Sequence, residues 1–324
     1  MSAPAGPISY VQKEGAAEAD LQVLNLVAFS GASNWPLWIG QQAGFFRDQG
    51  IELRLKLTPN SALMARDLQS GEAQIALTSI DNVIAYTNGH GEVPLDGPAD
   101  FFAFMGVDAG LLSIMAQPGI NAVGGLRGQR LAVDALTTGY AFVLKELLSL
   151  WSVTDADVEY LAVGTGAERL AALKAGTCSA TLLNAPLCLA AEYAGKRRIV
   201  RASEVLGSYQ GIVGAAGRNW AASNRNVVEK FIRAFHRSLY WLRDPENYAA
   251  ACTLLADRMP ILNAVVPLAY RTLVTDRGLE ENLGINWEGT VRVIKLREKY
   301  GRPNGGLGDP SRYIDDSFRL AALA

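Results

Sequence analysis

Hydrophobic residues from Leu21 onward follow two different periods, which predict strands and helices in alternation. Residues 51–57 carry an aliphatic side chain at every second position, which is the period of a strand. Residues 21–29 and 74–77 are short β-rich runs and are also predicted as strands. A polar, turn-rich loop at 30–36 follows the first of them, so that strand ends before the next element begins.

Helices are predicted between these strands. Residues 37–46 form a helical stretch that stops near Gly50. Asn60 or Ser61 can cap a second helix that reaches Leu68, because a side-chain oxygen there accepts from an otherwise unpaired backbone N–H. Strands that alternate with helices of this length predict a mainly parallel sheet covered by helices on both faces, which is the α/β class.

The same order of elements returns further along the chain. Identities between the two copies are few, so two ordinary β-α-β units could produce the match by chance. The agreement in element order nevertheless favours two lobes of similar construction. The matched strand segments are residues 25–29 with 130–134, 53–58 with 158–163, and 75–78 with 180–183.

Two β-rich segments without a helix pattern are predicted to connect the lobes, at 108–117 and 209–217. Two crossings make a hinge. The chain then becomes helical, since apolar residues recur at three- and four-residue steps from Val228 to Leu242, before Pro245. Further helices are predicted at residues 248–255, 261–273 and 287–300.

The predicted division has three parts. Residues 1–20 form a flexible tail or signal remnant. Residues 21–110 and 215–324 form lobe one, and residues 111–214 form lobe two. The resulting fold is α/β and two-lobed, with mainly parallel sheets flanked by helices and two hinge crossings.

Composition excludes several classes of protein. A chain of 324 residues with 49% hydrophobic and 19% charged residues can bury a large core. Thirty Lys and Arg against 32 Asp and Glu leave a net charge of -2, which gives no reason to expect a nucleic-acid or anionic-membrane partner. No apolar run is long enough to insert into a membrane as a spanning helix.

The first twenty residues lack the basic start and apolar stretch of a secretory signal. Either the protein is cytoplasmic, or it is periplasmic and a signal peptide precedes this numbering.

Cysteine and histidine are too few for several chemistries. Cys178, Cys188 and Cys252 are an odd number without C-x-x-C spacing, so they predict neither a disulfide framework nor a zinc ribbon. His90 and His236 are the two histidines, which argues against a His-rich metal site or a Ser-His-Asp hydrolase. No metal and no cofactor are therefore expected.

Two glycine-rich segments lack the residues of a nucleotide site. Residues 164–169 follow a strand and open a helix, but the third glycine of the dinucleotide motif is missing. Residues 305–308 lack the Lys-Ser/Thr of a phosphate loop. Residues 195–198, with Arg201, form a small basic cluster that is either solvated surface or a contact with another subunit.

Loops at the carboxyl ends of the strands are the predicted ligand site, because ligands of open α/β sheets bind there and between domains. Backbone N–H groups at the helix starts after Ser33 and Thr138 can bind an anion or a polarised oxygen. The candidate ligand-binding residues are Asn34, Trp35, Ser61, Thr78, Ser79, Asp81, Asp108, Thr137, Thr138, Gly139, Tyr140, Gly164, Thr165, Asn184 and Tyr209.

The same residues have simpler explanations. Ser, Thr and Asn at these positions can be helix caps only. Trp35 and Tyr140 can stack on a flat ligand or cover the edge of the core. Asp81, Asp108 and Asp134 are acids near the same mouth, and no Arg or Lys falls in these loops. A sulfonate or carboxylate held by backbone donors remains possible, but the loops favour a neutral or amine-bearing aromatic or heterocyclic ligand.

Several segments resemble a known family. Residues 36–38 leading into 44–53 (GFFRDQGIEL) resemble the start of the substrate-binding proteins of ABC importers for nitrate, sulfonates, taurine and thiamine-pyrimidine precursors, the NMT1/THI5-like family. Residues 126–133 (LRGQRLAV) resemble the start of that family's second lobe. Residues 173–186 and 228–245 extend the likeness, which covers Leu21 to about Tyr300.

This resemblance implies a type II periplasmic-binding-protein fold. It also implies a monomer that captures a small organic ligand by closing two lobes and meets an ABC transporter permease.

Two other functions stay open. Relatives of the family include desulfinases and thiamine-pyrimidine synthases. A desulfinase-like mechanism requires a cysteine in the first loop, where this chain has Ser30 and Ser33. The synthases use a cysteine cluster that is absent here. Both departures favour a non-catalytic binding protein over an enzyme. A ligand sensor without a transporter is the third alternative.

Overall fold

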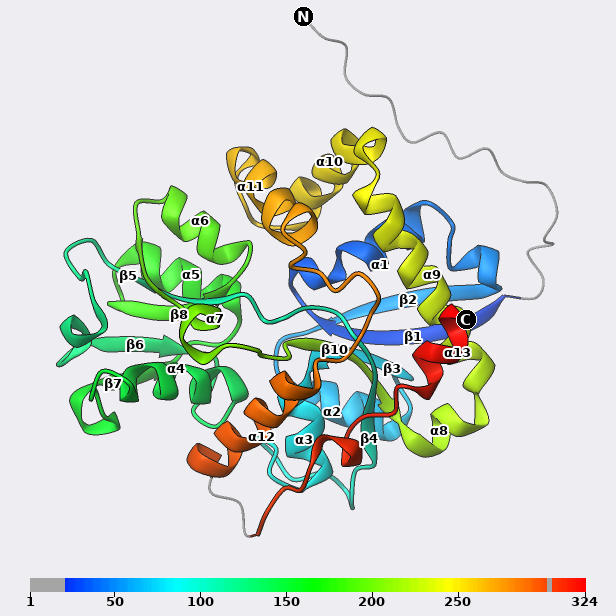
Figure 1. The fold of residues 1–324 in the computed structure, drawn as a ribbon, viewed down its shortest axis with the longest axis horizontal. Coiled ribbons are helices and arrows are strands. Elements are labelled where there is room, and N and C mark those ends of the chain that lie inside the picture. The colour runs from blue at the N-terminus through cyan, green and yellow to red at the C-terminus, as the bar shows by residue number, and fades with distance from the viewer. Residues whose placement is uncertain (1–20, 302–304) are drawn as a thin grey trace, which may run out of the picture.

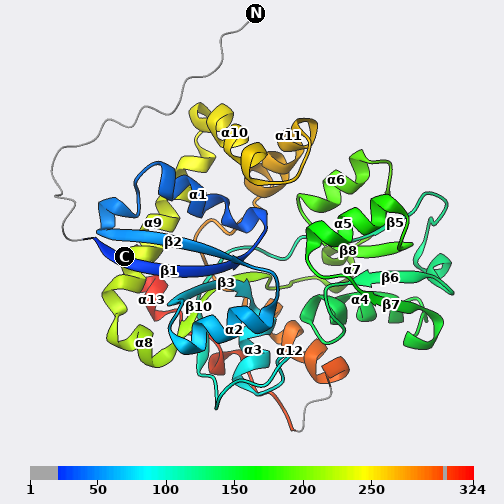
Figure 2. The same ribbon diagram turned by 180° about the vertical axis from the view of Figure 1, so that it is seen from behind.

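The computed structural model describes residues 21–301 and 305–324. Two α/β lobes lie side by side and are joined through the middle of the molecule (Figures 1 and 2). The predicted tail at residues 1–20 lies outside the described residues. Each lobe contains one five-stranded sheet with helices on both faces, so the predicted two-lobed α/β fold is confirmed.

The sheet of the first lobe has the strand order β2-β1-β3-β10-β4. Strands β1 and β2 are parallel along their whole length. β10 runs antiparallel to both of its neighbours, β3 and β4. The strands are β1 (Gln22–Phe29), β2 (Ile51–Thr58), β3 (Ile75–Ser79), β4 (Phe101–Gly106) and β10 (Ile212–Gly217).

The sheet of the second lobe has the order β7-β6-β8-β5-β9. β6 is parallel to β7 and β8, and β5 runs antiparallel to β8 and β9. The strands are β5 (Leu112–Ala116), β6 (Arg130–Val133), β7 (Glu159–Ala162), β8 (Ala180–Asn184) and β9 (Arg197–Arg201).

The two sheets repeat one design. β1, β2 and β3 occupy the same places in the first sheet as β6, β7 and β8 in the second, as the sequence match predicted. In each sheet the antiparallel member lies next to a crossing between the lobes, β10 in one and β5 in the other. The sheets are therefore mainly parallel, with one reversed strand each that the sequence pattern did not indicate.

Two strands were not predicted, for opposite reasons. All six residues of β4 are buried, so this strand has no alternation of apolar and polar positions. β9 carries three arginines and forms the edge of its sheet, where charges prevent pairing with other chains. The basic cluster predicted as solvated surface is in part this edge strand.

Helices cover both faces of the sheets (Figure 1). The predicted helix at 261–273 forms, but it is not uniform: a 3₁₀ turn, Asn263–Val265, leads directly into a short α-helix at 266–270, whose first turn accommodates Pro267. A π-helical turn, Arg271–Thr275, follows that helix. The helices are α1 (Trp35–Gln42), α2 (Ser61–Ser70), α3 (Ile80–Thr87), α4 (Gly139–Ser149), α5 (Gly166–Ala175), α6 (Leu187–Tyr193), α7 (Ala202–Leu206), α8 (Arg218–Ser223), α9 (Arg225–Arg243), α10 (Tyr248–Arg258), α11 (Val266–Tyr270), α12 (Trp287–Gly301) and α13 (Ser317–Leu323).

Helix α9 packs against the first lobe through its apolar stripe, as predicted. Phe231 and Phe235 are fully buried, and the ring of Phe231 stacks on that of Phe46 at a centroid distance of 5.6 Å. The helix ends at Arg243, just before Pro245. This packing attaches the long C-terminal segment to the lobe where the chain began.

Helix α12 contacts both lobes. It packs on α3 of the first lobe and on α4 of the second, and it lies between them in Figure 1. Tyr300 stacks on Phe142 of α4 at 6.2 Å between ring centroids. Lys299 and Tyr300 each donate to Glu146 of α4 at 2.6 Å. The lobes are thus joined by a helix as well as by the two crossings.

Candidate functional site

A cavity of about 140 Å³ lies between the lobes, with walls from both. An apolar cavity of roughly 150 Å³ holds one benzene molecule, so this cavity suits a solute of about that size. The first lobe contributes Phe29, Ser30, Gly31, Ser33, Pro59, Asn60, Ser61, Ser79, Asp81, Asn82, Glu92 and Ile212. The second lobe contributes Asp134, Ala135, Thr138, Gly139, Tyr140, Gly164, Thr165, Gly166, Arg169, Asn184 and Leu187.

Four helices with a polar N-cap begin at this cavity. α2 and α3 follow β2 and β3 of the first lobe, and α4 and α5 follow β6 and β7 of the second. Each helix has a polar N-cap whose side chain accepts a backbone hydrogen bond. A helix N-terminus carries a partial positive charge and unpaired N–H groups, so the four together favour a negatively charged or strongly polar group. The capping residues are Asn60, Ser79, Thr138 and Thr165.

Most of the predicted site residues line this cavity: Ser61, Ser79, Asp81, Thr138, Gly139, Tyr140, Gly164, Thr165 and Asn184. The structure brings them together because they follow the carboxyl ends of parallel strands in two facing lobes. The remaining predicted residues lie elsewhere: Asn34, Trp35, Thr78, Asp108, Thr137 and Tyr209.

Trp35 does not form a wall of the cavity. The prediction placed it in a loop, but it is the first residue of α1 and is fully buried. Its ring meets that of Tyr270 edge to face at 6.0 Å, so it belongs to the core of the first lobe. Asn34 is also fully buried, and its amide donates to the carbonyl oxygen of Phe29 at 2.7 Å.

Thr78 and Thr137 lie next to the cavity without lining it. Thr78 is buried and its hydroxyl accepts from the amide of Asn82, which itself lines the cavity. Thr137 is exposed, and its hydroxyl donates to Glu92 of the first lobe at 3.0 Å. Thr137 therefore ties the lobes together at the rim.

Tyr140 does line the cavity, at the start of α4. Its hydroxyl is buried and has no hydrogen-bond partner among the described residues. Burial, and after it the charges of Asp108 and Asp134, raise the pKa of this phenol far above its ordinary value. The hydroxyl therefore stays protonated and is a free donor at the cavity.

Asp81 is compensated by a distant arginine. Arg297 of α12 donates to both carboxylate oxygens, at 2.7 Å from Nε and 2.5 Å from Nη2. The two side chains are 1% and 3% exposed. Arg297 also donates to the carbonyl oxygen of Thr137 at 3.2 Å, so this ion pair of the first lobe reaches the second. Asp81 thus brings no uncompensated charge to the cavity.

Arg169 is a functional candidate that the pattern of the strand-end loops did not predict. The loops themselves contain no Arg or Lys, but Arg169 lines the cavity from the first turn of α5 and is 5% exposed. A sequence signal was present: Thr165 and Glu168 form a capping box that fixes where α5 begins. A residue four positions after the cap lies on the same helix face, which points Arg169 back toward the cap. The cavity therefore includes a cation.

Asp108 and Tyr209 belong to the crossings between the lobes. Asp108 Oδ1 accepts from the backbone N–H of Gly110 at 2.8 Å and of Ile212 at 3.1 Å. The ring of Tyr209 packs at Gly110, and its hydroxyl is buried without a hydrogen-bond partner among the described residues. Asp108 joins the two crossings to one another, so both residues belong to the hinge.

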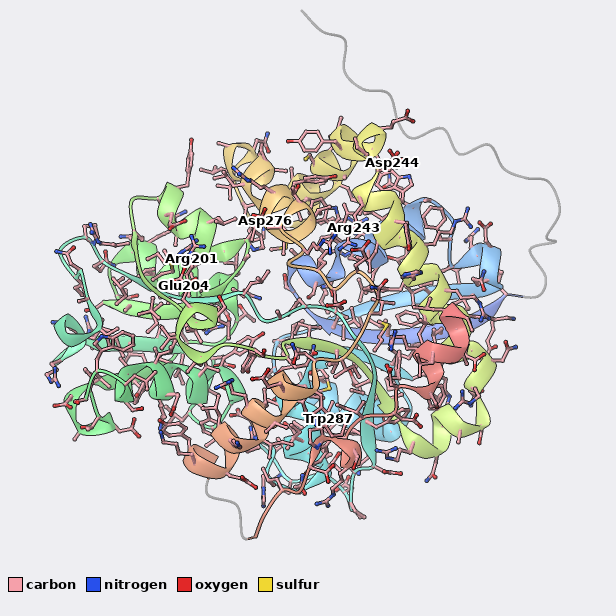
Figure 3. The ribbon with its side chains drawn as sticks, in the orientation of Figure 1. Arg201, Glu204, Arg243, Asp244, Asp276 and Trp287 are labelled. Carbon is pink, nitrogen blue, oxygen red and sulfur yellow. The ribbon has the colours of Figure 1, made fainter. Side chains whose placement is uncertain are left out.

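Ion pairs on the face of the crossings stay inside one lobe. Figure 3 labels Arg201 and Glu204 on the second lobe and Arg243 on the first. Arg201 pairs with Glu204 at 3.6 Å, and Arg243 pairs with Glu281 at 3.0 Å. The Arg201 pair is exposed and contributes little to stability, and the Arg243 pair is partly buried; because each lies within one lobe, neither holds the lobes together.

We expect Asp108→Asn to stabilise the protein at neutral pH. Removal from water raises the pKa of the Asp108 carboxyl above 3.8, and the hydrogen bonds from Ile212 and Gly110 oppose this only in part. The folded protein thus holds this proton more tightly than the unfolded chain does. The protonated carboxyl therefore contributes to the free energy of unfolding at low pH, and this contribution is lost as pH rises from about 3.8 through the folded pKa. Asparagine keeps an oxygen acceptor without the charge.

Urea unfolding of both proteins between pH 4 and pH 7 tests this expectation. The free energy of unfolding of the variant, minus that of the parent, should increase as pH rises. If the free energies of unfolding of the two proteins change with pH in parallel, the Asp108 charge does not destabilise the folded state.

Metal and membrane sites are not found in the described part of the chain. Across residues 21–301 and 305–324, no group of three His, Cys, Asp or Glu side chains is arranged to hold a metal ion. In those same residues, no helix has both the length and the apolar content to cross a bilayer.

Solved structures with the same fold are numerous. The periplasmic nitrate-binding protein NrtA from Synechocystis PCC 6803 superposes with a TM-score of 0.78 at 11% identity, over 94% of this chain and 89% of that one. The alkanesulfonate-binding protein SsuA from Xanthomonas axonopodis pv. citri, bound to MOPS, gives 0.70 at 17% identity, over 93% and 99%. A DszB mutant in complex with biphenyl-2-sulfinic acid gives 0.67 at 12% identity, over 93% and 98%.

Sequence comparison gives the family. No curated protein matches the chain by sequence. The family model described as NMT1/THI5 like matches residues 32–248, which run from the loop after β1 through both crossings and α9. With this match over more than half its length and the two-lobed fold of the periplasmic binding proteins, the chain belongs to the NMT1/THI5-like family.

Proposed function

We propose that the protein is the solute-binding component of an ABC importer, which captures a small organic solute between its lobes and releases it unchanged. The observation that carries this proposal is the cavity, whose walls come from both lobes in comparable parts. A solute that touches both walls binds the closed form more tightly than the open one and therefore favours closure. A permease that binds only the closed form would then receive loaded protein.

Contacts between the lobes support this mechanism. Thr137 donates to Glu92 across the rim, and Gly139 approaches Asp81 so closely that a Cβ on the glycine would lie 2.6 Å from the Asp81 Cβ. These residues flank the cavity, so the lobes touch where a solute would be enclosed. The structure of an ABC-type import ligand-binding component from Staphylococcus aureus with zinc bound, at TM-score 0.73 and 14% identity, has the same fold.

Periplasmic location is part of this proposal, with a cytoplasmic protein as the alternative. NrtA is named as a periplasmic nitrate-binding protein. We also propose that the protein acts as a monomer and that the division between the lobes falls at the crossings. β10 belongs to the first sheet from Ile212 onward, so we now place the second boundary near residues 211/212 rather than 214/215.

An enzyme on this fold is the second candidate, and the DszB complex is the observation that favours it. Ser30 and Ser33 line the cavity, and they lie in the loop where a desulfinase-like mechanism would require a cysteine. Among the described residues, no cysteine or histidine lines the cavity. Burial raises the pKa of the thiols of Cys178 and Cys188, which further reduces their reactivity. Binding without conversion is therefore the function that the chemistry of the walls supports better.

Native mass spectrometry of the purified full-length protein tests the proposal. We expect a co-purified organic solute at one per chain. The same solute, added back after removal under denaturing conditions, should raise the melting temperature and be recovered unaltered. A solute recovered as a different compound would favour the enzyme, and a protein that neither retains nor is stabilised by any solute would contradict both candidates.

A further inference from the structure

Arg169 carries a charge that nothing in the described structure neutralises. Its side chain is 5% exposed, and Nη1 donates to the carbonyl oxygen of Leu182 at 2.9 Å. Nε is buried without a hydrogen-bond partner, and no described carboxylate forms an ion pair with this guanidinium. A buried charge without a counter-charge is unfavourable, so the site is incomplete without an anionic group.

The guanidinium faces the cavity. Arg169 and Gly166 both line it, and Nη2 lies 3.8 Å from the position that a Cβ on Gly166 would take. Because Gly166 has no side chain, nothing on that residue covers the Nη2 edge of the guanidinium. The Nε and Nη2 edge of an arginine presents two parallel donors, which match the two oxygens of a carboxylate or sulfonate.

Asp134 is the second unmatched charge. It lines the cavity from the end of β6, and Oδ1 accepts from the hydroxyl of Thr138 at 2.7 Å. Among the described residues, no Lys, Arg or His pairs with this carboxylate. Asp134 is partly exposed, so it can meet a solute group that enters from the cavity.

Two other acids lie at the cavity. Asp81 is paired with Arg297. Glu92 has no ion-pair partner among the described residues, but it is exposed, so water can solvate its carboxylate, which also accepts from Thr137. Arg169 and Asp134 remain, and both act electrostatically on the hydroxyl of Tyr140, in opposite senses. Arg169 and the partly buried Asp134 thus line the same cavity of about 140 Å³ as the unpartnered hydroxyl of Tyr140.

We propose that Arg169 and Asp134 select a dipolar solute, whose acidic group binds Arg169 and whose amino group binds Asp134. This inference rests on the proposed function and names its substrate class. A dipolar solute neutralises both charges at once, whereas a simple anion leaves Asp134 unmatched and close to added negative charge. A neutral ring leaves both charges unmatched.

Matched pairs of solutes test the selection by isothermal titration calorimetry. β-Alanine and propionate, taurine and ethanesulfonate, and 4-aminobenzoate and benzoate each differ by one amino group. At pH 5.5 and pH 7.5, we expect the amino member of the pair that fits best to bind at least about tenfold more tightly, the strength of one charge-assisted hydrogen bond. Equal binding within every pair, or tighter binding of nitrate than of any dipolar solute, would overturn the inference.

Variants assign the two roles separately. Arg169→Gln keeps a donor for Leu182 and should weaken binding of the acidic group by roughly 10- to 100-fold in both members of a pair. Asp134→Asn should instead abolish the difference within a pair, while the acid without the amino group binds at least as tightly as before because a repulsive charge is removed. Lys174→Gln removes an exposed charge from the same helix and is the control, with no change expected.

Failure of this inference differs from failure of the proposed function. If native mass spectrometry finds a neutral solute or a simple anion bound at one per chain, the protein binds solutes but the selection by Arg169 and Asp134 is refuted. If Arg169→Gln fails to fold, judged by circular dichroism, Asp134→Asn still decides through the loss or persistence of discrimination. Retained discrimination in Asp134→Asn refutes the role of that carboxylate.

Discussion

Arg297→Met is expected to destabilise the folded protein by about 3–5 kcal/mol, the cost of breaking a buried ion pair by removing one partner. The substitution leaves the Asp81 carboxylate at 1% exposure without its counter-charge. It also removes the donor to the Thr137 carbonyl oxygen and so weakens the contact of α12 with the second lobe. Equilibrium unfolding in guanidinium chloride measures the change.

Two further variants show whether the charge is responsible. Asp81→Asn combined with Arg297→Met removes both charges and should recover a substantial part of the loss, because no isolated charge remains buried. Lys295→Met, at an exposed position on the same helix, should change stability by less than about 0.5 kcal/mol. A loss below about 1 kcal/mol for Arg297→Met would mean that water reaches Asp81 and that the pair is not part of the core.

Gly139→Ala is expected to weaken solute binding by about 10- to 100-fold, because overpacking of 1–3 kcal/mol falls on the closed form alone. The new methyl group would lie 2.6 Å from Cβ and Cγ of Asp81, which belongs to the other lobe. Gly139 is the first residue of α4, where alanine suits the helix, so the second lobe itself should fold normally. The lobes should then fail to close.

Small-angle X-ray scattering with and without a bound solute separates closure from folding. The parent should become more compact on binding, and Gly139→Ala should not. Gly124→Ala is the matched control, since beyond its chain neighbours a methyl group there would meet only one arginine side-chain atom of the same lobe, at 3.8 Å. Unchanged affinity and normal compaction in Gly139→Ala would mean that the lobes close by a different approach.

Local patterns account for the parts of the fold that the sequence predicted. β2 alternates strictly, Asn60 caps α2 by accepting from Leu63, and the stripe of α9 recurs at helical spacing. Each of these signals comes from residues that belong to the same helix or strand or lie within a few positions of it. β4 was not predicted because it is buried on both faces and so lacks alternation of apolar and polar residues. β9 was not predicted because its arginines interrupt the same alternation.

The site was predictable in its loops and not in its charges. Loops at strand ends follow from the topology alone, which is why most of the predicted residues line the cavity. The partner of Asp81 lies 216 residues further along the chain, on a helix whose own pattern says nothing about the cavity. Trp35 is buried in the core because its ring packs on Tyr270, which also lies far away in the sequence.

The place of β10 in the chain determines which of the two sheets can be completed first during synthesis. All five strands of the second sheet lie between Leu112 and Arg201, so that sheet can form as soon as this segment emerges. The first sheet must wait, because β10 separates β3 from β4 and is synthesised only afterwards. Until then the apolar strand β4 has no neighbour in its sheet, and nascent chains are most exposed to chaperones and to aggregation during that interval.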